Sequence, residues 1–231
     1  MVSGKLLAVD TATQSCGVAI VADGWLQAEL ILNQGGTHTK QILATIDAAL
    51  KLSGSLPEQV DAFAVTRGPG SFTGLRIGIS TIKGLAFATG KPIVGISSLD
   101  VLAHQVGDGD TALVCSMIDA RRNEIYWRVY RRKSDGLDAL SDEQVGPIEE
   151  LARQIDDSCF FVGNAVSEYA VQLPSLVKQK VQWASDACNT IRPSVLARLA
   201  WQRFEQGDVD DVGCFAPVYL RRSDAELMHG S

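Results

Sequence analysis

Three short apolar runs precede the first helix-like segment of this sequence, and this order is the strongest constraint on its fold. The runs are residues 5–10, 17–22 and 25–32. Asp23-Gly24, between the second and third runs, is typical of a tight β-hairpin. Helix and strand patterns then alternate as far as residue 104. Because a three-stranded meander is followed by alternating helices and strands, the sequence predicts a mixed sheet with helices on its faces.

A short polar stretch, Gly107-Asp108-Gly109-Asp110, predicts a boundary between two lobes, residues 1–106 and residues 107–231. Beyond it the order of strands followed by helices partly repeats. Strands are expected at 111–118, 124–131, 137–145 and 160–162, and the main helices at 167–173 and 193–206. Residue identity between the halves is poor, so the duplication is a topological inference.

The bulk composition is that of an ordinary globular protein, with 46% hydrophobic and 21% charged residues. The net charge of −6 argues against a protein that binds nucleic acid with its whole surface, but it allows a local basic patch. The five cysteines are scattered, without a C-x-x-C pair, which favours reduced thiols. With no signal-peptide pattern and no apolar run of about 20 residues, a cytoplasmic protein without membrane contact is expected.

The segment Asp10-Thr11-Ala12-Thr13 follows the first predicted strand and has two interpretations. An acid and hydroxyl groups at this point could coordinate magnesium and nucleotide phosphates. Alternatively, Asp10 and Thr11 close a turn through side-chain to backbone hydrogen bonds. The residues alone favour the turn.

Residues 67–78, RGPGSFTGLRIG, form a glycine-rich loop that enters a predicted helix over residues 71–89. The amide groups at the start of this helix could hold an anion, although the loop lacks the Gly-Lys-Ser/Thr end of a Walker motif. The spacing of Gly70, Gly74 and Gly78 also suits close packing. A helical projection places large apolar groups and two cations on one face, which is typical of a partner-binding surface. This face comprises Phe72, Leu75, Arg76, Ile79, Lys83 and Ala86. Packing with partner binding is favoured over phosphate binding.

The three histidines, His38, His104 and His229, do not pair at helical spacing, so no metal site of paired histidines is predicted. His38 is expected to cap a helix or to lie at an interface. No G-x-S-x-G motif indicates a serine hydrolase.

The segment from Arg121 to Lys133 interleaves six cations with three aromatic residues. Such a segment could bind RNA through phosphate contacts and base stacking. It also matches an amphipathic strand with one charged face, which is the favoured interpretation. Local contact with RNA stays open.

Together, four segments resemble the bacterial TsaB (YeaZ) family across nearly the whole chain. They are residues 10–13 (DTAT), 67–78 (RGPGSFTGLRIG), 118–126 (IDARRNEIY) and 217–221 (PVYLR). The glycine-rich segment is the most specific of them. The resemblance implies an α/β fold of two actin-like (ASKHA superfamily) lobes, each a mixed sheet with flanking helices.

The resemblance also implies a function. The family serves as a non-catalytic scaffold or activator in threonylcarbamoyl transfer to the adenosine 3′ of the anticodon, in tRNAs that read codons starting with A. It acts with the transferase TsaD and the ATPase TsaE, without a cofactor, and its contact with tRNA is expected to be indirect. A homodimer is a further expectation when the partner is absent.

In this family the helices after the third and fourth strands contact TsaD, which here correspond to residues 37–52 and 71–89. The expected partner-binding residues are His38, Ile42, Phe72, Leu75, Arg76, Ile79 and Lys83.

One departure from actin-like ATPases concerns the second lobe, where Asp119-Ala120-Arg121 and Gly163-Asn164 lack the acid-glycine-glycine pattern that nucleotide binding needs. Asp10, Thr11 and Thr13 are therefore expected to form a vestigial nucleotide site. The alternative function is a small kinase or ATPase that uses Asp10 and Thr11 on magnesium nucleotide. A peptidase is disfavoured, because no nucleophile with a base or metal site is apparent.

Overall fold

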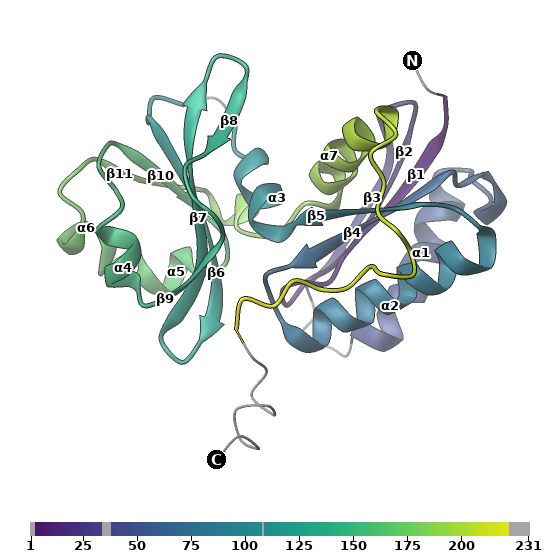
Figure 1. The fold of residues 1–231 in the computed structure, drawn as a ribbon, viewed down its shortest axis with the longest axis horizontal. Helices are drawn as coiled ribbons and strands as arrows, with labels where there is room; N and C mark the ends of the chain where they lie inside the picture. Colours follow the sequence, from purple (N-terminus) through teal and green to yellow (C-terminus); the bar gives the residue numbers. More distant parts are fainter. Residues whose placement is uncertain (1–2, 34–37, 108, 222–231) are drawn as a thin grey trace. The chain divides into compact units, whose positions relative to one another are not determined.

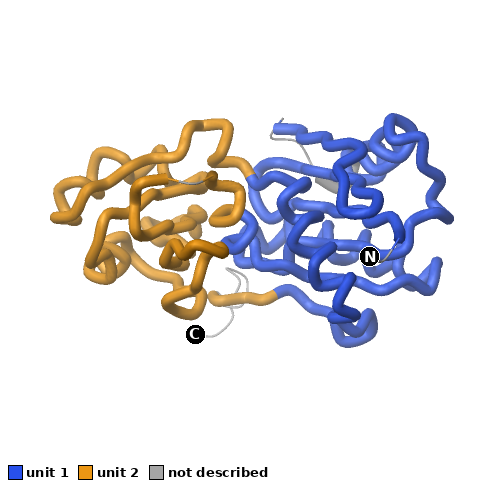
Figure 2. The backbone as a smooth tube through the Cα atoms, turned by 90° about the horizontal axis from the view of Figure 1, so that it is seen from above, with its two compact units in different colours: residues 1–101, 191–217 blue, residues 102–190, 218–231 orange. Residues whose placement is uncertain are grey.

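The computed structural model describes residues 3–33, 38–107 and 109–221 of the chain, which divides into two compact units (Figure 2). Unit 1 comprises residues 1–101 and 191–217, and unit 2 comprises residues 102–190 and 218–231. The structure thus corrects the prediction that residues 107–231 form one lobe. The chain returns to unit 1 after residue 190, so the last helix completes the first lobe.

Unit 1 is built on a five-stranded mixed sheet in the order β3-β2-β1-β4-β5 (Figure 1). The strands are β1 (Lys5–Asp10), β2 (Cys16–Ala22), β3 (Trp25–Leu32), β4 (Ala62–Gly68) and β5 (Ile93–Ser97). β1, β2 and β3 pair antiparallel, whereas β4 pairs parallel to both β1 and β5. The predicted meander and mixed sheet are confirmed.

Two helices, α1 (His38–Leu52) and α2 (Phe72–Thr89), cover one face of this sheet, and α7 (Pro193–Glu205) covers the other (Figure 1). A short 3₁₀ turn, Pro57–Gln59, precedes β4. α2 begins where the Ser71 hydroxyl accepts a hydrogen bond from the Gly74 amide, and it ends at Gly90 in the left-handed conformation. The helix predicted at 71–89 is confirmed.

Strand alternation sorts the residues of β1 and β2 between the two faces. Large apolar residues such as Leu7 and Val18 face α1 and α2 and form the core of unit 1. On the α7 side, β2 carries Gly17, where a Cβ atom would lie 3.1 Å from the Pro193 ring. The small residue allows α7 to approach the sheet closely.

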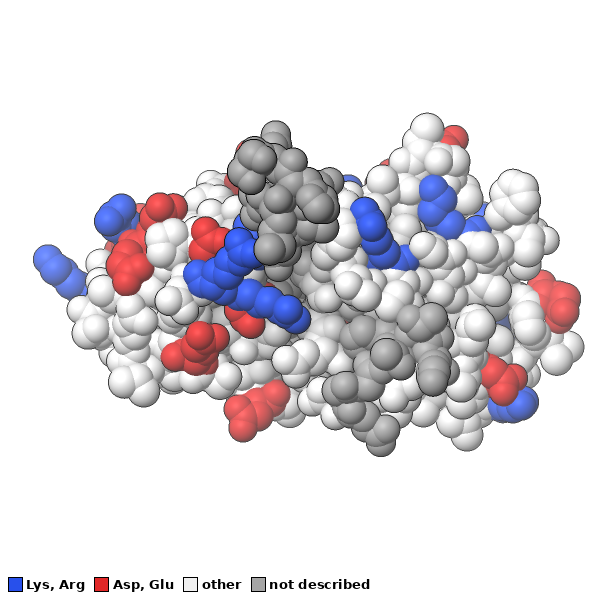
Figure 3. Space-filling model, turned by 90° about the horizontal axis from the view of Figure 1, so that it is seen from below, with Lys and Arg blue, Asp and Glu red and all other residues white. Residues whose placement is uncertain are grey.

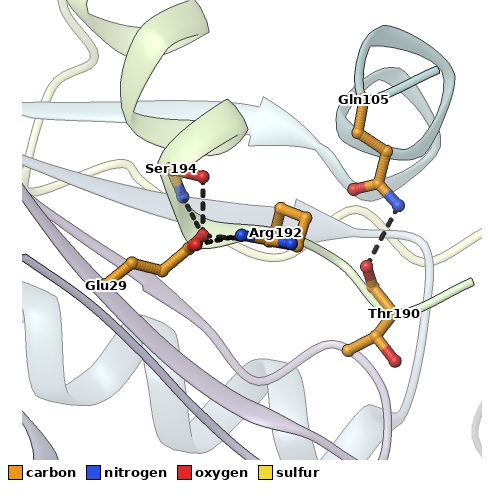
Figure 4. A network of polar contacts seen from close by, with 5 residues as sticks. All are labelled: Glu29, Gln105, Thr190, Arg192 and Ser194. Atoms are coloured by element: carbon orange, nitrogen blue, oxygen red, sulfur yellow. Dashed lines mark hydrogen bonds and ion pairs between the residues drawn. The ribbon is translucent and has the colours of Figure 1, made fainter. Parts of the chain in front are cut away.

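The start of α7 is fixed to the edge strand β3 by the carboxylate of Glu29. The Ser194 amide and hydroxyl donate to Glu29 Oε1 at 3.0 and 2.6 Å, and Arg192 forms an ion pair with the same carboxylate (Figure 4). Burial alone would raise the pKa of Glu29, but the hydrogen bonds from Arg192 and Ser194 lower it below its ordinary value. Glu29 thus supplies from a distant strand the cap that the helix start needs.

Unit 2 contains a six-stranded sheet in the order β11-β10-β6-β7-β8, with β9 also paired to β7. The strands are β6 (Leu113–Arg121), β7 (Glu124–Lys133), β8 (Gly136–Ala139), β9 (Gln144–Gly146), β10 (Cys159–Val162) and β11 (Val181–Trp183). β10 pairs parallel to β6 and β11, and the remaining pairs are antiparallel. The strand predicted at 137–145 is therefore two short strands, and β11 was not predicted.

Short helices flank the sheet of unit 2. They are α4 (Ile148–Ala152), α5 (Val166–Tyr169), α6 (Leu173–Leu176) and a 3₁₀ turn, Asp186–Cys188. The single helix predicted at 167–173 is thus interrupted into α5 and α6. α3 (Ser98–His104) spans the boundary between the units, and the Gln105 side-chain amide after it donates to the Thr190 carbonyl at 3.0 Å (Figure 4). Within the described residues, every helix is too short or too polar to cross a lipid bilayer.

Candidate functional site

Asp10 lies at the end of β1 and is completely buried. Its Oδ1 atom accepts hydrogen bonds from the Thr66 hydroxyl at 2.7 Å and from the Ala12 amide at 3.1 Å. Its Oδ2 atom has no hydrogen-bond partner among the described residues. Burial raises the pKa of this carboxyl group to about 6, although the bonds from Thr66 and Ala12 act in the opposite direction. The turn interpretation is therefore confirmed for Asp10.

The two threonines of the same loop differ in accessibility. Thr11 is 1% exposed, and its hydroxyl donates to the Gly74 carbonyl in α2 at 2.8 Å. Thr13 is half-buried, and its hydroxyl lies 3.1 Å from that of Ser15. Of the three residues proposed for a vestigial nucleotide site, only Thr13 reaches the surface.

The glycine-rich loop lies directly against this segment, and its glycines are the reason. A Cβ atom at Gly70 would lie 2.3 Å from the Ala12 carbonyl oxygen, and one at Gly74 would lie 2.0 Å from the Thr11 carbonyl oxygen. The Ser71 amide donates to the Ala12 carbonyl at 2.7 Å. The first turn of α2 thus closes over the β1–β2 loop, and the predicted close packing is confirmed.

The face predicted on α2 is only partly at the surface. Leu75 and Ile79 are 1% and 4% exposed, and Ile79 belongs to the core of unit 1. The expectation that they lie on an accessible surface is therefore wrong. α2 packs against α1 as well as against the sheet, so its apolar arc is wider than one contact requires. Phe72 and Arg76 are accessible, and the Arg76 guanidinium lies 3.9 Å from the centre of the Phe72 ring.

Lys83 has a structural partner within unit 1. Its ammonium group donates to the carbonyl groups of Phe215 at 2.8 Å and Gly213 at 3.3 Å. It thereby fastens the segment after α7 to α2. The half-buried side chain is a tie between two parts of unit 1 rather than a projecting cation.

α1 shows a similar shift of face. Ile42 is 1% exposed and belongs to the core, so its expected place on an accessible surface is wrong. His38 is the first residue of α1, but its side chain lies outside the described part of the chain, as does the proposed cap Thr37.

Two large apolar residues missed by the sequence prediction are exposed instead. Leu43 on α1 is 60% exposed and Phe87 on α2 is 87% exposed. The signal was present, because Leu43 follows a core residue and Phe87 stands between two alanines. Neighbouring helical residues point about 100° apart and cannot all face one core. We call Leu43, Phe72, Arg76 and Phe87 the α1–α2 outer surface.

The cationic segment 121–133 is the end of β6 and the whole of β7, so its strand interpretation is confirmed. The aromatic residues Tyr126, Trp127 and Tyr130 are 8%, 0% and 2% exposed. They contribute to packing on both faces and are not available as stacking platforms for bases. Among the described residues, no cluster of three or more potential metal ligands is present.

The chain is 33% identical to the tRNA threonylcarbamoyladenosine biosynthesis protein TsaB of Escherichia coli (strain K12), over 96% of each chain. The solved structure of YeaZ from Pseudomonas aeruginosa covers 94% of this chain and 100% of its own, with a TM-score of 0.79 and 30% identity. A more distant structure, component A of the Acidaminococcus fermentans (R)-2-hydroxyglutaryl-CoA dehydratase, covers 87% of this chain and 99% of its own. Its TM-score is 0.53 at 11% identity, a likeness that concerns the actin-like fold alone.

A protein-family model for TsaD, described as tRNA N6-adenosine threonylcarbamoyltransferase, matches residues 27–228. The match to the Escherichia coli TsaB sequence is nearly complete in both directions, and the fold agrees with that of YeaZ. The predicted two-unit actin-like architecture is confirmed. The chain therefore belongs to the TsaB (YeaZ) family.

Proposed function

We propose that this chain serves in the biosynthesis of tRNA threonylcarbamoyladenosine as a non-catalytic subunit that binds a TsaD-type transferase and works with the ATPase TsaE. The observation that carries the proposal is the closure of the β1–β2 loop by α2, which buries Asp10 completely. The name of the Escherichia coli relative supports the assignment to this modification. The match to the TsaD family model supports descent from a transferase fold whose chemistry resides in the partner.

The closed loop argues against the alternative of a magnesium-nucleotide enzyme. A metal ion at Asp10 would have to reach a carboxylate that is bonded to Thr66 and covered by Gly74 and Gly78. A Cβ atom at Gly78 would lie 2.3 Å from the Thr11 hydroxyl, which shows how little space remains there. Binding of a nucleotide would require α2 to leave the sheet, at the loss of the core contacts made by Ile79 and Ile82.

The α1–α2 outer surface is the docking site that we assign to the transferase. Leu43 and Phe87 lie on neighbouring helices that contact each other on one face of the sheet (Figure 1). Aromatic and arginine side chains dominate the binding energy of many protein interfaces, and Phe72, Arg76 and Phe87 are of these types. The same surface would pair two copies of the chain in the absence of the transferase.

The test uses cells depleted of this protein, with threonylcarbamoyladenosine in tRNA measured by nucleoside mass spectrometry. We expect the nucleoside to disappear and to return with the wild-type chain and with Asp10→Asn. The double variant Leu43→Asp/Phe87→Asp should fail to restore it and should lose the purified transferase in a pull-down. Val171→Asp is the matched control, because Val171 is an apolar residue of unit 2 that is 91% exposed.

The outcomes separate the parts of the proposal. Unchanged nucleoside levels in depleted cells would contradict the assignment to this modification. Rescue and transferase binding by the double variant would contradict the docking surface alone. Failure of Asp10→Asn in a folded chain, together with tight binding of magnesium-ATP by calorimetry, would favour the nucleotide enzyme.

A further inference from the structure

The turn between β6 and β7 holds three consecutive residues in the left-handed backbone conformation. The φ angles of Arg121, Arg122 and Asn123 are 61°, 57° and 59°. A two-residue hairpin turn of this hand usually carries Asn-Gly or Asp-Gly, because side chains crowd the backbone there. All three residues are exposed, so packing does not require their side chains. Strain held at an exposed tip with two arginines points to a role for the arginines themselves.

The tip is held in place by hydrogen bonds from residues on either side. The Arg121 amide donates to Asp119 Oδ1 at 2.6 Å, and the Asp119 amide donates to Asn164 Oδ1 at 3.0 Å. Arg221 donates to Glu124 Oε2 at 2.7 Å, across from Arg121 in the strand register. The carboxylates nearest the tip thus have partners within unit 2, which leaves the positive charge of the arginines less opposed.

The other four cations of this segment are tied into unit 2. Arg128 donates to the Ser141 carbonyl at 2.9 Å, and Arg132 donates to the Gly107 carbonyl at 2.9 Å. Arg131 lies 3.7 Å from Asp156, and Lys133 is paired with Asp138. Only the tip therefore presents cations that project from the end of a hairpin. Figure 3, which looks at the lower side of Figure 1, shows Lys and Arg side chains gathered on this face among Asp and Glu.

We propose that Arg121 and Arg122 bind phosphate groups of the tRNA backbone. This proposal rests on the proposed function, which supplies tRNA as the substrate of the assembly. Guanidinium groups recognise phosphate through paired hydrogen bonds, and a projecting hairpin can reach a groove that a flat surface cannot. Since the aromatic residues of β7 are buried, the contact reads charge and shape and does not read bases.

The test is a titration of the full-length chain, bound to its transferase, with an unmodified transcript of a tRNA that reads codons starting with A. We expect Arg121→Gln/Arg122→Gln to weaken binding on the order of ten-fold at about 0.1 M salt. The slope of log K against log salt should decrease in magnitude by about 1.5, as for two lost phosphate contacts. Arg121→Lys/Arg122→Lys should retain most of the salt dependence.

The matched control is Arg153→Gln/Lys178→Gln, which removes two exposed cations elsewhere in unit 2. An equal loss in the control would show general electrostatic attraction and overturn the site. Unchanged binding and slope in the arginine-to-glutamine variant would also overturn it. If that variant loses the transferase instead, the hairpin contacts an acidic protein surface, and the RNA assignment is wrong.

The two proposals fail separately. Persistence of threonylcarbamoyladenosine in depleted cells overturns the proposed function, whatever the titration shows. Full nucleoside dependence together with unaltered tRNA binding by the hairpin variant overturns only the inference about Arg121 and Arg122.

Discussion

The Thr66 hydroxyl on β4 donates a hydrogen bond of 2.7 Å to the carboxylate of Asp10 on the neighbouring strand β1, and both side chains are buried. The pair joins two parallel strands beneath the first turn of α2. Burial raises the pKa of Asp10 from 3.8 to about 6, despite this bond. A carboxyl group that is harder to ionise in the folded chain makes stability depend on pH.

Asp10→Asn is expected to remove that dependence. Between about pH 4 and pH 6 the folded chain holds a proton on Asp10 that the unfolded chain has released, so wild-type stability falls as pH rises through this window. Relative to the wild type, the variant should gain on the order of 3 kcal/mol in unfolding free energy from pH 4 to pH 7. Urea unfolding at several pH values measures the difference, and parallel curves would contradict the assignment.

Thr66→Val is the companion variant. It keeps the shape of the side chain but removes the hydroxyl that favours the ionised carboxylate. We expect it to lose about 1.5–3 kcal/mol at pH 7 and to shift the end of the pH window upward. In the Asp10→Asn background its effect should be smaller, because no charge remains to be stabilised.

The glycines of α2 give a prediction with an internal control. Gly74→Ala and Gly78→Ala would place a Cβ atom 2.0 Å from the Thr11 carbonyl oxygen and 2.3 Å from the Thr11 hydroxyl. Each should destabilise the chain by roughly 3 kcal/mol, because backbone and buried groups must move. Gly84→Ala meets no atom within 4 Å and should stabilise the helix by about 0.5–1 kcal/mol. Equal effects of all three in urea unfolding would exclude close seating of α2 on the loop.

The two faces of the helices predict opposite results for similar substitutions. Ile79→Asp buries a charge at a position that is 4% exposed and should unfold the chain. Phe87→Asp affects a side chain that is 87% exposed, so its unfolding free energy should stay within about 0.5 kcal/mol of the wild type. Circular dichroism and thermal unfolding of the two variants decide the matter. A stable Ile79→Asp chain would mean that α2 is rotated about its axis from the position described.

The local part of this structure could be predicted from the sequence, because hydrophobic alternation and turn residues act over a few positions. The meander, α1, α2 and the strand nature of β7 followed from such patterns. The burial of Asp10 could not be predicted, since it depends on α2 crossing the β1–β2 loop more than 60 residues later in the chain. The projection of α2 identified a mixed face but not which arc of it the neighbouring helix α1 would cover.

The place of α7 shows the same limit at longer range. Its pattern predicts a helix at 193–206, but its packing partners are Gly17 and Glu29 in the first lobe. A sequence read in order assigned it to the second lobe, because a contact over 165 positions leaves no local signal. The exposed side chains Leu43 and Phe87 were missed for a related reason, since exposure is decided by the neighbours that the fold supplies.

Glu29→Gln tests the anchor of α7. The lowered pKa of Glu29 means that its ionised form is favoured in the folded chain, so its contribution is present above the ordinary pKa of glutamate and is lost as pH falls. We expect a loss of about 1–3 kcal/mol at pH 7 that shrinks below about pH 4.5. Glu205→Gln, at an exposed position of the same helix, should change little. A gap that is the same at pH 4 and pH 7 would exclude a charged anchor.

The left-handed tip of the β6–β7 hairpin predicts a separation of stability from RNA binding. Arg122→Gly should keep or raise the unfolding free energy, by up to about 0.5 kcal/mol, because glycine adopts positive φ without crowding. Arg122→Val should lower it by more than 1 kcal/mol, since a β-branched residue is poorly tolerated at φ 57°. Both variants lack the guanidinium group and should lose tRNA affinity to the same extent. If affinity instead followed stability across the two variants, the arginine would act by shaping the turn and not by contacting phosphate.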